Sequence, residues 1–153
     1  MSRIIDIIRT SASLTTLCEW FDIGQWGDLN DELALQDIEM ATQGAVFPCI
    51  LLRLPYSEAE NEDSNFYFPD SLNIYFINTT DPETKQIDRH DNDFPTIRTM
   101  KDDFKMHLRN NGTEFTSPIK TEHFFSKYVK NKLQTNVDVI HLNFTNLKYF
   151  KNC

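Results

Sequence analysis

The chain of 153 residues holds only three cysteines and four glycines, and no uninterrupted apolar run reaches 18 residues. The cysteines Cys18, Cys49 and Cys153 lie far apart and are odd in number, which argues against a disulfide framework and a zinc knuckle. Four glycines without a cluster exclude a phosphate-binding loop. The lack of a long apolar run excludes a membrane-spanning helix. Because the start also lacks a cleavage site of small residues, we expect a soluble protein that is not secreted and has no membrane partner.

Basic residues are scarce in the first part of the chain, and acidic residues are scarce in the second. Residues 1–91 hold 17 acidic and 5 basic side chains, whereas residues 92–153 hold 6 acidic and 10 basic ones, within a total net charge of −8. A pI of about 4.9 argues against nucleic acid as a general partner, although the basic part leaves a local contact open. The two parts attract each other either within one subunit or between copies packed head to tail in a closed ring.

The centre of the predicted fold is a buried strand over residues 72–78, which are rich in β-branched and aromatic side chains. Polar residues follow this strand, and Asp81 with Pro82 favours a turn. We therefore expect residues 79–93 to leave the core as a polar arm.

A helix is predicted over residues 94–110. Pro95 suits its first turn, where a missing N–H costs nothing, and Asn111 with Gly112 tolerates the left-handed conformation that ends helices. The apolar residues recur every three or four positions and so share one face, which we expect to be buried: Phe94, Ile97, Met100, Phe104 and Leu108.

Two apolar sets with helical spacing occupy the start of the chain. They predict one helix that begins near Ser2, with a break near Thr10 and Ser11 left open. Residues 46–54 predict a second strand, in which Pro48 favours an edge position or a strand start. The two helical sets are Ile4, Ile5, Ile7 and Ile8, and then Leu14, Leu17, Cys18 and Phe21.

Two acidic segments have no strong periodicity. Residues 24–44 mix acidic side chains with apolar ones that have no obvious core, so a short helix and a partner-facing arm both remain open. Residues 56–65 predict a solvated acidic loop because four carboxylates follow one another closely there: Glu58, Glu60, Glu62 and Asp63.

The basic C-terminal part begins with a predicted turn over residues 113–118. Residues 122–133 fit a helix, or a strand followed by a turn, and their apolar stripe favours the helix. Residues 137–149 alternate between apolar and polar side chains, which predicts a half-buried antiparallel strand. The helical stripe comprises Phe124, Phe125, Tyr128, Val129 and Leu133, and the buried side of the strand comprises Ile140, Leu142 and Phe144.

The predicted elements follow the order helix, strand, strand, helix, uncertain helix and strand, which does not repeat as alternating parallel units. We therefore predict the α+β class, with a mostly antiparallel sheet packed against helices on one face. The length favours a single domain over residues 1–153.

One loose catalytic pattern is present. Asp70, Glu83 and Lys85 match nucleases in which two carboxylates hold a divalent cation and a lysine assists the attacking water. In those enzymes the second acid and the lysine lie on a strand, whereas here they follow a turn. A metal-dependent nuclease is therefore a remote alternative.

The remaining reactive side chains favour structural roles. The four histidines have no metal-binding spacing, so we expect them at the surface or its rim: His90, His107, His123 and His141. Cys49 lies within an apolar strand, which predicts an inert core thiol. We expect no enzymatic activity, no cofactor and no metal.

Four stretches follow one another in an order that has a counterpart in a known family. They are residues 46–52 after the N-terminal helix and acidic connection, the central strand 73–77, the helix start 94–97 after the polar arm, and the closing strand 137–144. This order resembles the tail-terminator and head-to-tail connector proteins of tailed bacteriophages. The Asn-rich, Phe-rich composition is similar to that of crass-like phage proteins.

The resemblance implies a tail-terminator-like fold and a structural virion protein of the neck. Such proteins form rings, often of six or twelve copies, around the DNA channel, beside portal, adaptor or tail ring proteins. The implied location is the virion neck, and the host cytoplasm during assembly. The polar arm is where the resemblance places ring contacts, and the charge asymmetry adds the basic segment, so the expected interface residues are Asp81, Glu83, Lys85, Arg89, Lys127, Lys130 and Lys132. A small acidic adaptor that binds a host or phage protein remains the alternative.

Overall fold

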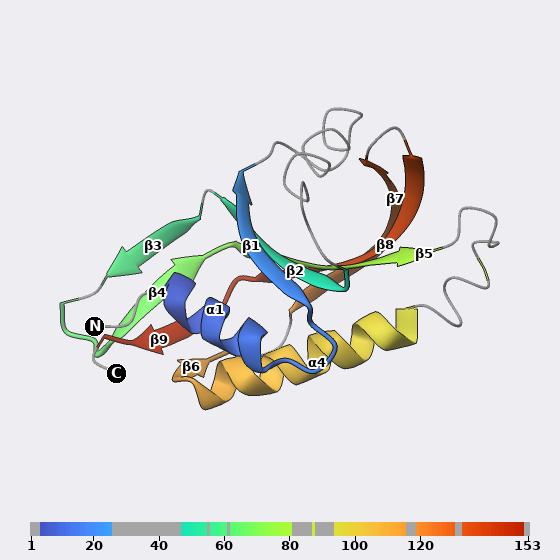
Figure 1. Cartoon of the computed structure of the whole chain (residues 1–153). Helices are drawn as coiled ribbons and strands as arrows, with labels where there is room; N and C mark the ends of the chain where they lie inside the picture. The colour runs from blue at the N-terminus through green and yellow to red at the C-terminus, as the bar shows by residue number, and fades with distance from the viewer. Residues whose placement is uncertain are drawn as a thin grey trace.

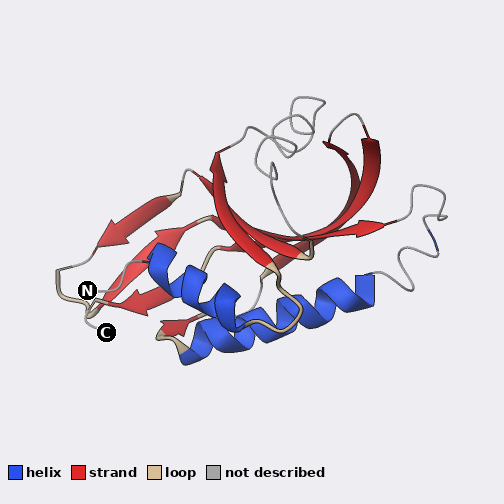
Figure 2. Cartoon of the chain, in the orientation of Figure 1, coloured by secondary structure: helices blue, strands red, loops and turns tan. Residues whose placement is uncertain are grey.

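The computed structural model describes residues 4–25, 47–54, 56–60, 62–80, 87, 94–115, 119–130 and 133–151 (Figure 1). These residues form two sheets and two helices of an α+β fold, as predicted. Figure 2 shows the helices together on one side of the larger sheet and the smaller sheet at the end where both termini lie. Among the described residues, neither helix has the length and apolar character needed to cross a membrane.

The larger sheet has five strands in the order β1, β2, β5, β8, β7. All neighbours are antiparallel except β1 and β2, and the sheet curves around its long axis (Figure 1). The predicted central strand lies in the middle as β5 and continues to Thr80, beyond the predicted end at residue 78. The strand bounds are Trp20–Gln25 for β1, Cys49–Leu54 for β2, Leu72–Thr80 for β5, Lys120–Lys130 for β7 and Leu133–Phe144 for β8.

The main core lies between the convex face of this sheet and the two helices, α1 (Ile4–Leu14) and α4 (Phe94–Asn110). The bounds of α4 agree with the prediction. Its predicted apolar face is confirmed where its side chains are described, because four of them are fully buried in the core: Ile97, Met100, Phe104 and Leu108. Phe104 meets Phe76 of β5 edge to face, with the ring centroids 5.4 Å apart.

A second apolar cluster lies on the concave face of the same sheet. Side chains alternate across a strand, so each central strand supplies residues to both faces. β5 sends Ile74 and Phe76 to the helices and Tyr75 and Ile77 to the concave side. The concave cluster comprises Cys49, Leu51, Tyr75, Ile77, Val137 and Val139, against which Trp20 and Phe47 pack.

The smaller sheet has four strands in the order β3, β4, β9, β6. Their bounds are Ser57–Glu60 for β3, Phe66–Asp70 for β4, Lys148–Phe150 for β9 and Thr113–Glu114 for β6. The predicted acidic loop at residues 56–65 is therefore wrong, because residues 57–60 pair along their whole length with the aromatic strand β4. The predicted turn at residues 113–118 is wrong where it begins, since Thr113 and Glu114 form β6.

The two sheets are two parts of one long antiparallel ribbon that opens in the middle. β4 runs into β5 and β8 runs into β9, with the same register on both sides: Leu72 lies opposite Phe144, and Tyr67 lies opposite Tyr149. Between these pairs, residues 68–71 and 145–148 do not pair with each other. Ser71 adopts a left-handed φ of 56°, which turns the strand there.

The helix predicted over residues 122–133 is a strand, β7, in its described part. Its apolar residues satisfy a helical stripe, but they are aromatic and β-branched, and β7 pairs with β8 at eleven consecutive positions. The ladder provides backbone hydrogen-bond partners along the whole segment. This pairing determines the conformation, although the apolar residues also have helical spacing.

The first helix also differs from the prediction, because it ends at Leu14 and shows no break at Thr10. Leu17 adopts a left-handed φ of 74°, and Phe21 belongs to β1. Leu14 and Leu17 are exposed, so the second apolar set does not extend the helix face. β2 starts at Cys49, directly after Pro48. Of the two positions predicted for Pro48, the structure thus confirms the one at the start of a strand.

Candidate functional site

One edge of the larger sheet is basic. β7 is the edge strand beside β8, and no described residue pairs with its outer side. It carries Lys120, Lys127 and Lys130 of the sequence, and the side chain of Lys120 is 72% exposed and lies 3.0 Å from Glu122. Open strand edges offer backbone groups to another chain. Of the expected interface residues, Lys127 and Lys130 belong to β7, while Lys132 lies outside the described residues.

One edge of the smaller sheet is acidic. All four residues of β3 are exposed, and Glu58 and Glu60 lie two positions apart, on the same face of the strand. The Tyr149 hydroxyl donates a hydrogen bond to Glu58, and Lys151 lies 3.4 Å from Glu60. Two more carboxylates, Glu62 and Asp63, follow in the next turn, so this edge keeps an excess of negative charge.

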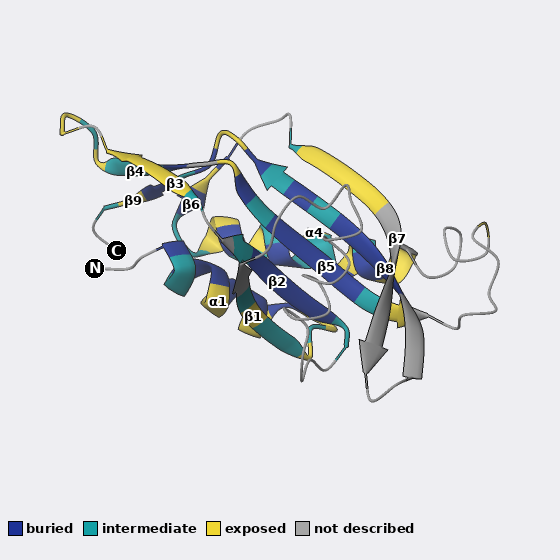
Figure 3. Cartoon of the chain, turned by 90° about the horizontal axis from the view of Figure 1, so that it is seen from above, coloured by how far each residue is buried: buried dark blue, intermediate teal, exposed yellow. Residues whose placement is uncertain are grey.

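The two charged edges lie far apart on the molecule. Figure 1 shows β3 at the end with the two termini and β7 toward the opposite end, and Figure 3 shows the same separation after a quarter turn. Both edges contain exposed residues in Figure 3, whereas the central strands between them are buried. The arrangement lets a second copy place its acidic edge near the basic edge of the first.

Most residues predicted in the two arms lie outside the part of the chain that the structure describes. Asp81, Glu83, Lys85 and Arg89 of the polar arm lie outside the described residues, as do residues 26–46 of the acidic arm. Asp70 is the last residue of β4. The grouping of Asp70 with Glu83 and Lys85 that a nuclease would need therefore stays a prediction.

A groove of about 1040 Å³ opens where the ribbon separates, between β4, β6 and the turn from β8 to β9. Its apolar lining includes Phe68, Phe115 and Leu147. Two cations, Arg109 and Lys148, and one carboxylate, Glu114, also line it. The guanidinium of Arg109 lies over the Phe115 ring, 4.1 Å from its centroid. The residues that line this groove come from distant segments, and the local signal for it is the aromatic run over residues 66–68, which precedes a proline.

A row of polar side chains crosses the concave face of the larger sheet next to its apolar cluster. His141 Nε2 lies 2.7 Å from Asn73 Oδ1, and Asn143 donates to the same oxygen over 2.8 Å. The His141 ring also stacks on Tyr75, with centroids 4.3 Å apart, and its Nδ1 lies 3.6 Å from Glu122. Burial lowers the pKa of His141, against the opposing effect of the Glu122 carboxylate. The row therefore holds a neutral imidazole between β5, β7 and β8.

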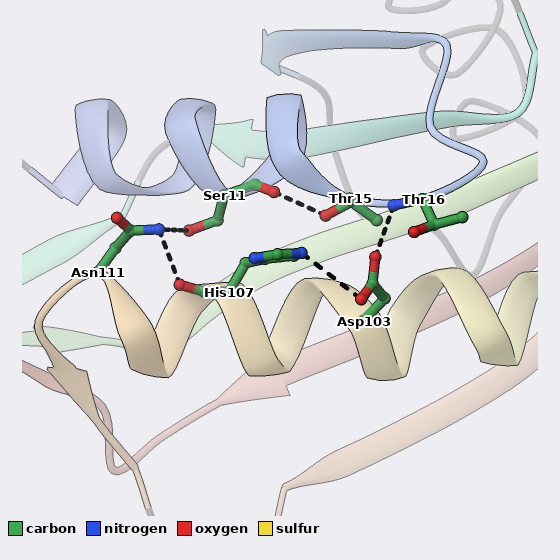
Figure 4. Close-up of polar contacts among 6 residues, drawn as sticks. All are labelled: Ser11, Thr15, Thr16, Asp103, His107 and Asn111. Atoms are coloured by element: carbon green, nitrogen blue, oxygen red, sulfur yellow. Dashed lines mark hydrogen bonds and ion pairs between the residues drawn. The ribbon is translucent and has the colours of Figure 1, made fainter.

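The two helices are joined by polar contacts at their exposed side (Figure 4). The backbone N–H of Thr16 donates to Asp103 Oδ2 over 2.6 Å, and His107 Nε2 lies 3.5 Å from Asp103 Oδ1. One turn further along α4, Asn111 donates to Ser11 over 3.4 Å and to the carbonyl of His107 over 2.8 Å. The hydrogen bond from Thr16 lowers the pKa of Asp103. This network fixes the end of α1 on α4.

The described histidines only partly agree with the expected surface positions. His123 is exposed and accepts a hydrogen bond from Arg98, His107 lies in the contact between the helices, and His141 is half-buried. His90 lies outside the described residues. Among the cysteines, Cys49 is buried and burial raises its pKa, as expected for an inert core thiol.

Within the described ranges, no three side chains of His, Cys, Asp or Glu come together in a group that could hold a metal ion. Comparison with protein-family models and with curated proteins finds no match for this chain. The charged edges and the groove are thus the features from which a function can be argued.

Proposed function

We propose that this protein is a structural subunit that assembles head to tail into a ring at the head-to-tail junction of a tailed bacteriophage. DNA would pass through the channel of the ring without sequence-specific binding. The observation that carries the proposal is the pair of open sheet edges of opposite charge, acidic at β3 and basic at β7. The order of elements that resembles neck proteins supports the location, and it also supports a ring of six or twelve copies.

The charge arrangement favours a ring over a two-fold dimer. In a head-to-tail ring each subunit offers two different surfaces, so β3 of one copy meets β7 of the next at every interface. A two-fold dimer brings the same patch of both copies together near its axis, where like charges repel. Strand edges add backbone hydrogen bonds to this attraction, as when one chain extends the sheet of another.

Charge reversal on the basic edge tests the proposal. We expect Lys127→Glu, Lys130→Glu and Lys132→Glu together to abolish ring formation while the monomer stays folded. Replacement of the same three lysines by arginine keeps the charge and should keep the ring. Native mass spectrometry and negative-stain microscopy give the copy number, and circular dichroism reports the fold.

A charge swap makes the test specific to the two edges. If β3 meets β7, then adding Glu60→Lys and Glu62→Lys to the reversed β7 should restore assembly. Raising the salt from 0.1 to 1 M should weaken the wild-type ring, because the screening length falls from roughly 10 Å to about 3 Å. Assembly that ignores both reversal and salt would contradict the proposal.

The two alternatives have their own outcomes in the same experiments. A small acidic adaptor stays monomeric at low salt and high protein concentration, and forms a complex only with another protein. A nuclease cleaves DNA with magnesium or manganese, and it loses this activity on combined replacement of Asp70, Glu83 and Lys85 by alanine. The proposed ring protein cleaves no DNA, and the triple variant assembles normally.

A further inference from the structure

The groove where the ribbon opens contains apolar and cationic side chains that have no role in the proposed ring contacts. We propose that the groove between β4, β6 and the β8–β9 turn binds an extended, apolar peptide segment of a neighbouring protein that carries a carboxylate. The groove lies at the end of the molecule away from β7, so a peptide could bind there with or without ring formation.

The shape of the groove follows from the ribbon. On both sides of the opening the two strands keep one register, but residues 68–71 and 145–148 stand apart. Two side-chain contacts fix the opening at Ser71: Asn73 donates to its carbonyl over 2.8 Å, and Asn143 Nδ2 lies 3.4 Å from its hydroxyl. β4 thus pairs with β3 on one side, while its other side is open beyond Tyr67. An open strand edge is the backbone surface to which extended peptides add.

The lining provides pockets for apolar side chains. Leu147 and Phe115 are buried beneath the groove, and Phe68, Pro69 and Ala59 form its other wall. The groove has a volume of about 1040 Å³, which is as large as the pockets that bind ligands in other proteins. Because the wall comes from a strand, alternate residues of a bound peptide would point toward it and supply the specificity.

The charge at the rim indicates what else the peptide carries. Lys148 lies 3.4 Å from Glu114, so its charge has a partner within the protein. Arg109 is exposed, and within the described part of the chain its guanidinium contacts the Phe115 ring and no carboxylate. A guanidinium carries its N–H donors in a planar fork, which binds a carboxylate with two hydrogen bonds. Among the described residues this cation has no acidic partner, so it presents a site for an anionic group.

A displayed library of random decapeptides, selected on the immobilised full chain, tests the proposal. We expect the enriched peptides to be apolar with at least one Asp or Glu, or to bind through a free terminal carboxylate. Synthetic fluorescein-labelled versions then give dissociation constants by anisotropy. Arg109→Gln should weaken binding roughly tenfold or more, the scale of one lost charge-assisted pair. Removing the peptide carboxylate should weaken binding to the wild type but not to this variant.

Two further variants separate loss of binding from loss of fold. Ala59→Trp places a large side chain in the groove from an exposed strand position and should block binding with an unchanged melting temperature. Arg98→Gln lies on the same helix as Arg109 but does not line the groove, so it should bind as the wild type does. If no peptide is enriched, or if the enriched peptides bind Arg109→Gln and Ala59→Trp as tightly as the wild type, the proposal is wrong. Neither result affects the ring, which is measured separately with the β7 variants.

Discussion

The two sheets continue each other along one ribbon, yet they differ in how they are covered. The middle of the five-stranded sheet is buried on both faces, and its strand β5 has fully buried side chains from Ile74 to Ile77. In the four-stranded sheet all of β3 is exposed, and Phe150 of β9 is 38% exposed. Both helices pack on the larger sheet, and α4 also contacts β6 of the smaller one, beside which the groove opens. The difference suggests that one sheet holds the fold and the other is available to partners.

If the larger sheet holds the fold, the largest loss of stability is expected from replacing Phe104, in the core between α4 and β5. Replacement by alanine removes a fully buried ring and its edge contact with Phe76, and should lower the free energy of unfolding by about 3–5 kcal/mol. Chemical denaturation measures the change. The control is Met106→Ala on the same helix, where the side chain is 48% exposed and the expected change is within about 0.5 kcal/mol. Equal losses for the two variants would show that the buried face of α4 is wrongly assigned.

A smaller loss is expected from Asp103→Ala, at the contact between the two helices. The carboxylate accepts the N–H of Thr16, a charge-assisted bond, and its partial exposure limits the loss to about 1–1.5 kcal/mol. The bond lowers the pKa of Asp103, so its contribution is present above the ordinary pKa and disappears as the pH falls through the folded one. Asp102→Ala, at a residue whose side chain is 68% exposed, serves as the control and should change little. A pH-independent difference between the wild type and Asp103→Ala would argue against this contact.

How far the sequence predicts this fold depends on whether an element is specified locally. α4 was predicted with its bounds and face because the spacing of Ile97, Met100, Phe104 and Leu108 is itself the signal. β5 was predicted because its run of β-branched and aromatic residues suits a buried strand whatever its neighbours are. Both elements belong to the well-covered sheet.

The failures concern elements that exist only through pairing. β3 consists of exposed residues including Glu58 and Glu60, so its own composition favours a solvated loop, and β4 makes it a strand. β7 carries a helical stripe that the ladder with β8 overrides. The groove could not be predicted, since Phe68, Arg109 and Leu147 come from distant segments that meet only where the ribbon opens.

The smaller sheet provides the matching aromatic test. Phe150 contacts Phe66, with ring centroids 4.5 Å apart, but it remains partly exposed. We expect Phe150→Ala to lower the free energy of unfolding by about 0.5–1.5 kcal/mol, the range for one aromatic pair. The same denaturation experiment compares it directly with Phe104→Ala. A loss as large as that of Phe104 would mean that the smaller sheet supports the fold as strongly as the larger one.

The smallest expected effect is the contribution of His141 to the pH dependence of the unfolding free energy. Its ring lies among Asn73 and Tyr75 of β5 and Glu122 of β7, and Arg53 of β2 and Lys120 of β7 add positive charge nearby. Because Asn73 Oδ1 already accepts from Asn143, we assign the proton of the neutral ring to Nε2, which donates to the same oxygen. Protonation would therefore occur at Nδ1, on the side of Glu122.

Burial lowers the pKa of His141 below its ordinary value of 6.5, so the unfolded chain takes up a proton at a higher pH than the folded one. Stability should accordingly be independent of this group above the ordinary pKa and fall as the pH decreases from there toward the folded pKa. His141→Gln keeps a donor near Asn73 and cannot be protonated, so the difference in unfolding free energy between wild type and variant should shrink on acidification. A difference that grows as the pH falls would mean that Glu122 outweighs burial, and that β7 is held to the sheet more strongly by a charged histidine than by a neutral one.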